Sequence, residues 1–290
     1  MLKMRVFLLA LDGLEYNLVK KYRLKNIMQK QYGYIEIPQE YFVETKVPWS
    51  SMEAEAVPYT PTIWATILTG LKPREHKIRH LLTYGRLLER IRYLPVISWV
   101  KGKRRLLEKI GIKRRIVSKT DLKAPTIFDA VNPSVAVWFP CYNMPTWLWE
   151  IMAREARTNV SKIPRAVWKV FRLRRKKVFA QLGKKWKLFG AYFETLDWLG
   201  HLYYVTRPLK LMNAYLVFDA LVGELKRWMP EDTVFLIVSD HGMEPSSDGV
   251  TGNHSKRAFW SLNIDTEWEP KDFTDFYPKV IEWVENKNSF

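Results

Sequence analysis

Aspartates and histidines occur in this sequence at points where buried strands are expected to end. The stretch FLIVSDHGM, residues 235–243, shows the pattern, because an apolar run leads directly into a carboxylate and an imidazole. The same residue types recur in FETLDWLGHLY (193–203) and TGNHSKRAFWS (251–261), and a further aspartate follows the first apolar run. The candidate ligands are Asp12, Asp197, His201, Asp240, His241 and His254. Carboxylates and imidazoles bind zinc and manganese, so these side chains suit two divalent cations.

A threonine adds a candidate nucleophile to these ligands. Residues 59–70 read YTPTIWATILTG, which predicts a short helix with Thr60 as its N-cap, Pro61 in its first turn and a glycine at its end. A helix N-terminus attracts anions, and because Pro61 has no amide hydrogen, the donors would be the amides of Thr62 and Ile63. Taken alone, Thr60 is better explained as a helix cap. Together with the six ligands it is a candidate for the nucleophile between two cations.

The elements that must position these residues can be read from the apolar runs. Four runs predict strands: 5–11, 134–139, 188–193 and 233–238. Helical patterns lie between them, and this alternation predicts an α/β fold with a doubly wound, mostly parallel sheet and helices on both faces. Such sheets collect their ligands at the carboxyl ends of the strands. We therefore expect the aspartates and histidines to meet at one edge.

Composition restricts the class of protein and its partners. The chain has 290 residues, 47% of them hydrophobic, which favours a globular protein over a disordered one. The single cysteine, Cys141, excludes an intramolecular disulfide and favours a cytoplasmic setting. No apolar run is long enough to predict a transmembrane segment. The net charge of +17 points to anionic partners, either phosphate esters, nucleic acid or an acidic membrane surface.

Two segments, 85–115 and 162–187, contain a large share of the lysine and arginine, interleaved with apolar residues. They read as amphipathic basic helices. We interpret the chain as one catalytic domain, 1–290, with small basic cap insertions at 82–122 and 145–186. The cap would attract an anionic substrate, and nucleic acid or membrane binding through it is an alternative, as is a simple solvated helix face.

The order of these motifs resembles the alkaline phosphatase superfamily, and within it the nucleotide pyrophosphatase/phosphodiesterase branch. A strand-end aspartate comes first, followed by a threonine nine residues before the threonine of a TG pair, the KPREH turn, D-x-x-x-H, SDHGM and G-x-H. The resemblance implies an alkaline-phosphatase-like fold. It implies one cation at Asp197, His201 and His254 and another at Asp12, Asp240 and His241, with Thr60 bound between them. Zinc is the expected metal, and manganese the alternative.

The function implied by the resemblance is a two-metal phosphoric-ester hydrolase that acts on a small phosphate ester, such as a nucleotide, through a covalent phospho-threonine. One departure concerns the substrate, because Leu81 stands where animal and bacterial enzymes of the branch place an asparagine that holds a phosphoryl oxygen. We expect diesters to be preferred, with the second substituent received by aromatic residues of the cap. A phosphomonoesterase, a phospho-substituent transferase and a non-catalytic binder of nucleic acid or membranes are the alternatives.

Overall fold

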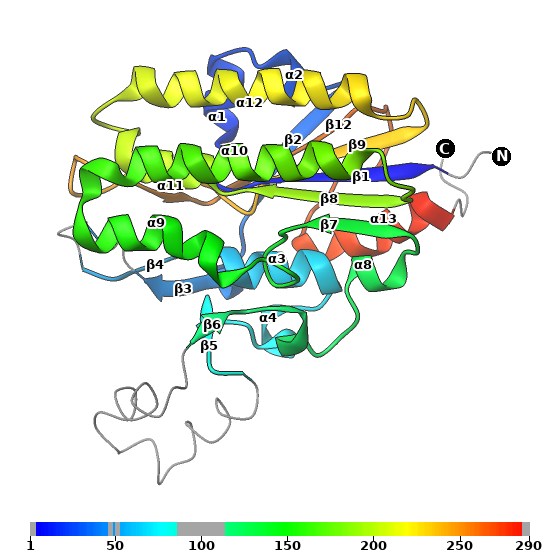
Figure 1. Cartoon of the computed structure of the whole chain (residues 1–290), viewed down its shortest axis with the longest axis horizontal. Helices are drawn as coiled ribbons and strands as arrows, with labels where there is room; N and C mark the ends of the chain where they lie inside the picture. Colours follow the sequence, from blue (N-terminus) through cyan, green and yellow to red (C-terminus); the bar gives the residue numbers. More distant parts are fainter. Residues whose placement is uncertain (1–3, 46–48, 50–52, 86–113, 286–290) are drawn as a thin grey trace, which may run out of the picture.

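A six-stranded sheet with the order β2-β12-β9-β1-β8-β7 forms the centre of the molecule (Figure 1). The computed structural model describes residues 4–45, 49, 53–85 and 114–285. The strands are β1 (Arg5–Leu11), β2 (Gln31–Glu36), β7 (Ser134–Val137), β8 (Leu188–Phe193), β9 (Thr233–Val238) and β12 (Arg257–Leu262). β7, β8, β1 and β9 are parallel to one another, and β12 is antiparallel to both of its neighbours, β9 and β2. The predicted α/β fold with a mostly parallel sheet is confirmed.

The four predicted strands are present, and three of them have the predicted bounds. The strand expected at 134–139 ends at Val137, because Trp138 adopts a left-handed backbone with a φ of 49°. β1 shows why the runs are apolar throughout. Its side chains alternate between two cores, with Leu8 in one and Phe7 in the other, and both are fully buried. A parallel strand covered on both faces needs apolar residues at every position.

Helices cover both faces of the sheet, as Figure 1 shows. One face carries α3 (Thr60–Thr69), α8 (Ile127–Ala130) and α13 (Phe276–Glu285). The other carries α1 (Tyr16–Lys21), α2 (Lys25–Met28), α9 (Thr146–Thr158), α10 (Ile163–Leu182), α11 (Thr195–Tyr203) and α12 (Pro208–Trp228). None of the helices in the described part of the chain has both the length and the apolar character to cross a membrane.

Short elements lie outside the sheet and its helical layers. α4 (Pro73–His76) follows α3. Three antiparallel pairs complete the described elements: β3 (Phe42–Thr45) with β4 (Glu55–Pro58), β5 (Leu82–Thr83) with β6 (Arg115–Ile116), and β10 (Gly242–Pro245) with β11 (Gly252–Ser255).

The basic segment 145–186 is the second of the expected cap segments. It contains most of α9 and α10, which lie between β7 and β8 in the chain, and α10 buries Val167, Val170 and Phe171 in the core on one face of the sheet. The apolar stripe of α10 therefore packs on the sheet. α9 is different in one respect, because its Trp149 lines the cavity described below.

Most of the other expected cap segment, 82–122, lies outside the described residues, which leave out 86–113. In its described part, Leu82 of β5 pairs with Ile116 of β6. Arg115 donates to both carboxylate oxygens of Asp121, at 2.6 and 3.0 Å. Arg115 therefore has a structural partner within its own segment.

Candidate active site

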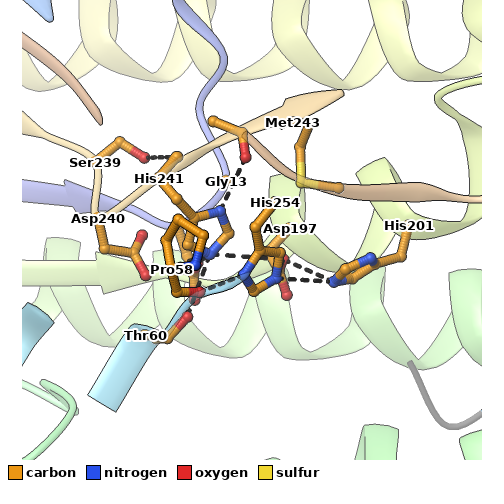
Figure 2. Close-up of polar contacts among 12 residues, drawn as sticks. Gly13, Pro58, Thr60, Asp197, His201, Ser239, Asp240, His241, Met243 and His254 are labelled. Carbon is orange, nitrogen blue, oxygen red and sulfur yellow. Dashed lines mark hydrogen bonds and ion pairs between the residues drawn. The ribbon is translucent and has the colours of Figure 1, made fainter. Parts of the chain in front are cut away.

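The carboxyl ends of three adjacent strands bring the candidate ligands together. β1 pairs with β8 up to Leu11 and Phe193, and with β9 up to Ala10 and Val238, so the three strands end at nearly the same level. Asp12 follows β1 directly, and Asp240 follows β9 after one serine. Figure 2 shows the side chains that gather at this edge.

Gly13 permits the close approach of the β1 turn to α11. Its φ is +73°, and a Cβ placed on it would lie 2.6 Å from the Cα atom of Asp197. A side chain at this position would push α11 away from the strand, so glycine is required on steric grounds. This contact places Asp12 next to Asp197. Within α11, Asp197 and His201 project from one face as their spacing predicts, with 3.1 Å between Asp197 Oδ1 and His201 Nε2.

The ligand atoms form two adjoining groups that share Asp197. In the first group, His254 Nε2 lies 3.3 Å from Asp197 Oδ1 and 3.1 Å from His201 Nε2. In the second, His241 Nε2 lies 3.1 Å from Asp12 Oδ1 and 3.9 Å from Asp197 Oδ1. The ligand atoms within each group lie within 4.8 Å of one another.

Asp240 borders the second group. Its Oδ2 is 3.4 Å from His241 Nε2, and the whole residue is buried. All six residues singled out in the sequence thus lie in one cluster. The second group of mutually close ligand atoms consists of Asp12, Asp197 and His241. The resemblance implied Asp240 in place of Asp197.

Backbone carbonyls fix the orientation of all three histidine rings. The Nδ1 atoms of His201, His241 and His254 lie 2.8, 2.9 and 2.7 Å from the carbonyl oxygens of Gly252, Gly242 and Pro58. A carbonyl only accepts, so each Nδ1 carries the hydrogen. In the neutral rings the lone pairs are then on Nε2, and all three Nε2 atoms face the cluster. This arrangement is typical of metal-binding histidines.

Four buried carboxylate oxygens in the cluster have no hydrogen-bond donor. They are Asp12 Oδ1, Asp197 Oδ1 and both Oδ atoms of Asp240. Burial and the neighbouring charge of Asp12 raise the pKa of Asp240 well above its usual range. Burial opposes protonation of His241, but the surrounding carboxylates, Asp240 and Asp12 foremost, raise its pKa to about 10. The cluster therefore has an excess of negative charge that divalent cations would neutralise, and its donor set fits them.

Thr60 faces this cluster. α3 starts at Thr60, its N-cap is Tyr59, and no side chain caps it, so the prediction that Thr60 is the N-cap is wrong. Thr60 Oγ1 instead lies 3.2 Å from His241 Nε2. The amides expected to bind an anion, those of Thr62 and Ile63, both donate to the carbonyl oxygen of Tyr59. The threonine hydroxyl, and not these amides, is what α3 presents to the cluster.

The histidine of the KPREH turn has a structural role here. His76 Nε2 lies 3.0 Å from Thr66 Oγ1 in α3, and its Nδ1 accepts from the amide of Ile78 at 3.0 Å. Burial, helped by the nearby charge of Arg79, lowers the pKa of His76 to about 4, so the ring is neutral. His76 holds α4 against the helix of Thr60 and is not part of the ligand cluster.

Sequence reasoning missed three residues that support the ligands. Tyr192 of β8 donates to Asp12 Oδ2 at 2.5 Å, and its ring lies 4.9 Å from the guanidinium carbon of Arg174. Arg174 is fully buried and pairs with Glu194 at 2.5 Å. Nothing in the sequence singles out Tyr192, because tyrosine is common in strands. Arg174 could have been recognised, because it is a charged residue on the apolar stripe of α10.

Glu15 is a fourth residue that the sequence gave no reason to select. It is fully buried and accepts from the amide of Met243 at 3.0 Å and from Ser255 Oγ at 2.7 Å. These bonds attach the β10–β11 pair, which carries His254, to the turn after Asp12. Glu15 thus fixes the position of one ligand relative to another.

A cavity of about 250 Å³ opens beside the cluster. Asp197, His201 and His254 line one side of it together with Thr60. A buried carboxylate and imidazole cluster with a threonine hydroxyl, at the carboxyl edge of an α/β sheet and next to a cavity, defines a candidate metal-dependent hydrolase site.

Comparison with known proteins identifies the family. The model of the type I phosphodiesterase / nucleotide pyrophosphatase family matches residues 6–288. This match spans nearly the whole chain, so the chain belongs to that family, and the resemblance found in the sequence is confirmed. A search of curated protein sequences gave no match.

Several solved structures are similar in fold. Murine ectonucleotide pyrophosphatase/phosphodiesterase 5 is 19% identical, with a TM-score of 0.47 over 84% of this chain and 58% of that chain. The human protein of the same name is 17% identical, with a TM-score of 0.45 over 84% and 58%. Phosphonoacetate hydrolase from Sinorhizobium meliloti is 15% identical, with a TM-score of 0.45 over 86% and 59%. This chain therefore spans less than two thirds of the length of each.

Proposed function

We propose that this protein is a metal-dependent phosphoric-ester hydrolase of the phosphodiesterase type, with Thr60 as its nucleophile. The observation that carries the proposal is the position of Thr60 Oγ1, 3.2 Å from His241 Nε2, beside buried carboxylate oxygens that have no donor. A capping role would require a bond from Thr60 to the helix backbone, and α3 has no side-chain cap.

The residues proposed to hold the cations are those of the cluster. Asp197, His201 and His254 would hold one, and Asp12, Asp240 and His241 the other, with Thr60 between them. Two divalent cations, zinc by preference and manganese as the alternative, would lower the pKa of the Thr60 hydroxyl and neutralise charge on the leaving oxygen. The first set is supported by its mutually close ligand atoms, and the second by Asp12 and His241 in the second group and by Asp240 Oδ2, 3.4 Å from His241 Nε2. All three Nε2 atoms face the cluster.

The proposed reaction has two displacements. In the first, Thr60 Oγ1 forms a bond to phosphorus while the bond from phosphorus to the ester oxygen breaks, and the alcohol leaves. In the second, water attacks the phospho-threonine, the bond from phosphorus to Oγ1 breaks, and the hydroxyl is restored. The chain's own residues prepare this site, because the carbonyls of Gly252, Gly242 and Pro58 hold the histidine rings. Tyr192 holds Asp12 by donating a hydrogen bond to its carboxylate.

We propose a single catalytic domain for 1–290, with 82–122 as a cap next to the cavity. Two observations support this arrangement. The cores on the two faces share one sheet, so they cannot be separated into independent units. Ile116 and Val117, at the described end of the proposed cap, line the cavity.

The test is turnover by Thr60→Ala and Thr60→Ser with bis(p-nitrophenyl) phosphate, after chelation and return of zinc or manganese. The alanine variant should lose activity by roughly a thousandfold or more, because no other group supplies the nucleophile. The serine variant should retain part of it. Thr69→Ala is the matched control, since Thr69 Oγ1 donates to the Ala65 carbonyl and accepts from the Leu71 amide at the far end of α3, away from the cluster.

Metal content measured by elemental analysis should be the same in all these variants. Turnover of the Thr60→Ala variant at the wild-type rate would contradict the nucleophile assignment. Absence of any turnover in the metal-restored wild type, combined with salt-sensitive binding of nucleic acid or anionic vesicles, would favour the non-catalytic anion binder.

A further inference from the structure

The cavity beside Thr60 is lined mainly by hydrocarbon. Among the described residues, its apolar lining includes Val57, Leu81, Ile116, Val117, Met144 and Trp149. No lysine or arginine in the described part of the chain lines it, although the chain has a net charge of +17. The basic character of the protein therefore does not extend to this lining.

The polar groups that do line the cavity are mostly engaged elsewhere. Glu194 is paired with Arg174 at 2.5 Å, and Tyr192 donates its hydroxyl hydrogen to Asp12. Asn253 donates through Nδ2 to Glu55 at 2.8 Å, and its Oδ1 accepts from the amide of His254 at 2.9 Å. These groups cannot turn toward a ligand without losing a buried partner.

Among the described residues, two hydroxyls remain, those of Thr45 and Tyr59, together with the indole N–H of Trp49, which has no hydrogen-bond partner. Tyr59 Oη already accepts from the amide of Leu81 at 3.0 Å. A nucleoside carries several donors and acceptors on its base and two oxygens on its sugar. Each polar group that is buried without a partner costs about 1–3 kcal/mol, so this lining disfavours a nucleoside.

We infer that the cavity receives a hydrocarbon substituent of the phosphate ester, an alkyl chain or an aryl ring, and not a nucleoside. The inference rests on the proposed ester hydrolysis, which places phosphorus at Thr60. Thr60 and Pro61 line the same cavity as Met144 and Trp149, so a group attached to phosphorus at Thr60 would contact this apolar lining. A closed cavity of ~150 Å³ holds benzene, so the 250 Å³ here accommodates an aryl ring or a short chain beside the phosphoryl group.

The leucine at position 81 fits this inference. Its side chain lines the cavity, and its amide donates to Tyr59 Oη at 3.0 Å. Leu81 therefore offers only apolar surface here, which favours a hydrocarbon group over a polar one in the same place.

The test compares phosphate monoesters as ligands of the metal-restored protein by calorimetry. Ethyl, butyl, hexyl and phenyl phosphate are compared with thymidine 5′-phosphate and inorganic phosphate. Affinity should rise by roughly fourfold per added methylene until the cavity is filled, and phenyl phosphate should bind at least tenfold more tightly than thymidine 5′-phosphate. Chain-length dependence separates an alkyl site from an aryl site. Equal affinity for all esters, or tighter binding of thymidine 5′-phosphate, would overturn the inference.

Two variants of α9 provide the matched pair. Trp149→Ala should lower the affinity for hexyl and phenyl phosphate by tenfold or more. Its affinity for inorganic phosphate should stay within twofold of wild type, because only the hydrocarbon contacts Trp149. Trp147→Ala should change neither, since Trp147 is 50% exposed and packs edge-to-face on Trp138 away from the cavity. Equal losses in both variants would show a general effect of α9 and would contradict the assignment.

Kinetics with p-nitrophenyl diesters separate this inference from the proposed function. Hydrolysis of the phenyl and hexyl diesters with a higher kcat/KM than the thymidine diester supports both. A higher kcat/KM for the thymidine diester than for the phenyl and hexyl diesters would support the proposed function and contradict the hydrocarbon site. If no diester is hydrolysed, the proposed function fails, and the binding series still decides whether the cavity selects hydrocarbon.

Discussion

Replacing Tyr192 with phenylalanine should weaken metal binding without disturbing the core. The hydroxyl of Tyr192 donates a hydrogen bond to Asp12 Oδ2 at 2.5 Å. The ring is held independently, 5.8 Å from Trp64 and 4.9 Å from the guanidinium carbon of Arg174. Phenylalanine retains both contacts. The substitution therefore removes one hydrogen bond and leaves the shape of the site intact.

The expected loss follows from the role of such a bond. Groups that orient a metal-binding side chain typically account for about 10–100-fold in metal affinity, or about 1.4–2.8 kcal/mol. Asp12 Oδ1 has no donor, so after the substitution neither oxygen of this buried carboxylate has one. We expect the metal dissociation constant of Tyr192→Phe to increase by that factor.

The assay is a competition titration of chelator-stripped protein with zinc against a chromophoric chelator. Tyr41→Phe is the matched control, because the buried Tyr41 also donates to a carboxylate, that of Asp272 at 2.7 Å, outside the cluster. It should reduce the free energy of unfolding and leave zinc affinity unchanged. Equal zinc affinity in Tyr192→Phe and wild type would refute the reasoning that Tyr192 positions Asp12.

Three further predictions concern the metals, pH and substrate. Restoring zinc at a free concentration 100 times its dissociation constant should raise the free energy of unfolding by about 2.7 kcal/mol per site in urea titrations, and no change would contradict metal binding at the cluster. Burial opposes ionisation of Asp272, but hydrogen bonds from Lys72, Thr274 and Tyr41 hold its pKa below the usual value. The stability that Asp272 contributes is therefore present above its unfolded pKa, near ~4, and is lost as pH falls through the lower folded value. Asp272→Asn should then be less stable than wild type at neutral pH, with the gap closing below pH ~4; a gap independent of pH would contradict this. Finally, kcat/KM should be at least tenfold higher for bis(p-nitrophenyl) phosphate than for p-nitrophenyl phosphate, because the described cavity lining offers no cation to the additional charge of a monoester; the reverse order would indicate a phosphomonoesterase.

Much of the fold was predictable because both faces of the sheet are covered. Parallel strands buried on both faces give continuous apolar runs, and the run of β1 was therefore recognisable without knowledge of its neighbours. β2 at one edge of the sheet and β12 beside it were not predicted. β2, with the sequence QYGYIE, has mostly partly exposed residues and no apolar run.

The candidate ligands were predictable for a different reason. Side chains that follow parallel strands meet at one edge whatever the loop details, so Asp12 and Asp240 could be placed together from the strand assignments alone. The grouping of ligand atoms depends on the approach of α11 to the β1 turn at Gly13, which sets Asp197 between the two groups. That approach is a tertiary contact and leaves no signal in local sequence.

Two helices show where local sequence is a weak guide. The lysines and arginines of α10 are conspicuous, but its apolar stripe decides where it packs. Thr60 was assigned as an N-cap from residue type, and the helix boundary differs by one residue, with Tyr59 at that position. This shift of one residue turns the hydroxyl from the helix backbone toward the ligand cluster.

The central claim is that Thr60 attacks phosphorus and forms a covalent intermediate. The stereochemistry of hydrolysis at a chiral phosphorothioate diester, measured in ¹⁸O-labelled water, tests it most directly. Two successive in-line displacements each invert the configuration at phosphorus, so the account predicts overall retention in the wild type and no turnover in Thr60→Ala. Overall inversion would show that water attacks the substrate directly, and would contradict the role of Thr60 as the nucleophile.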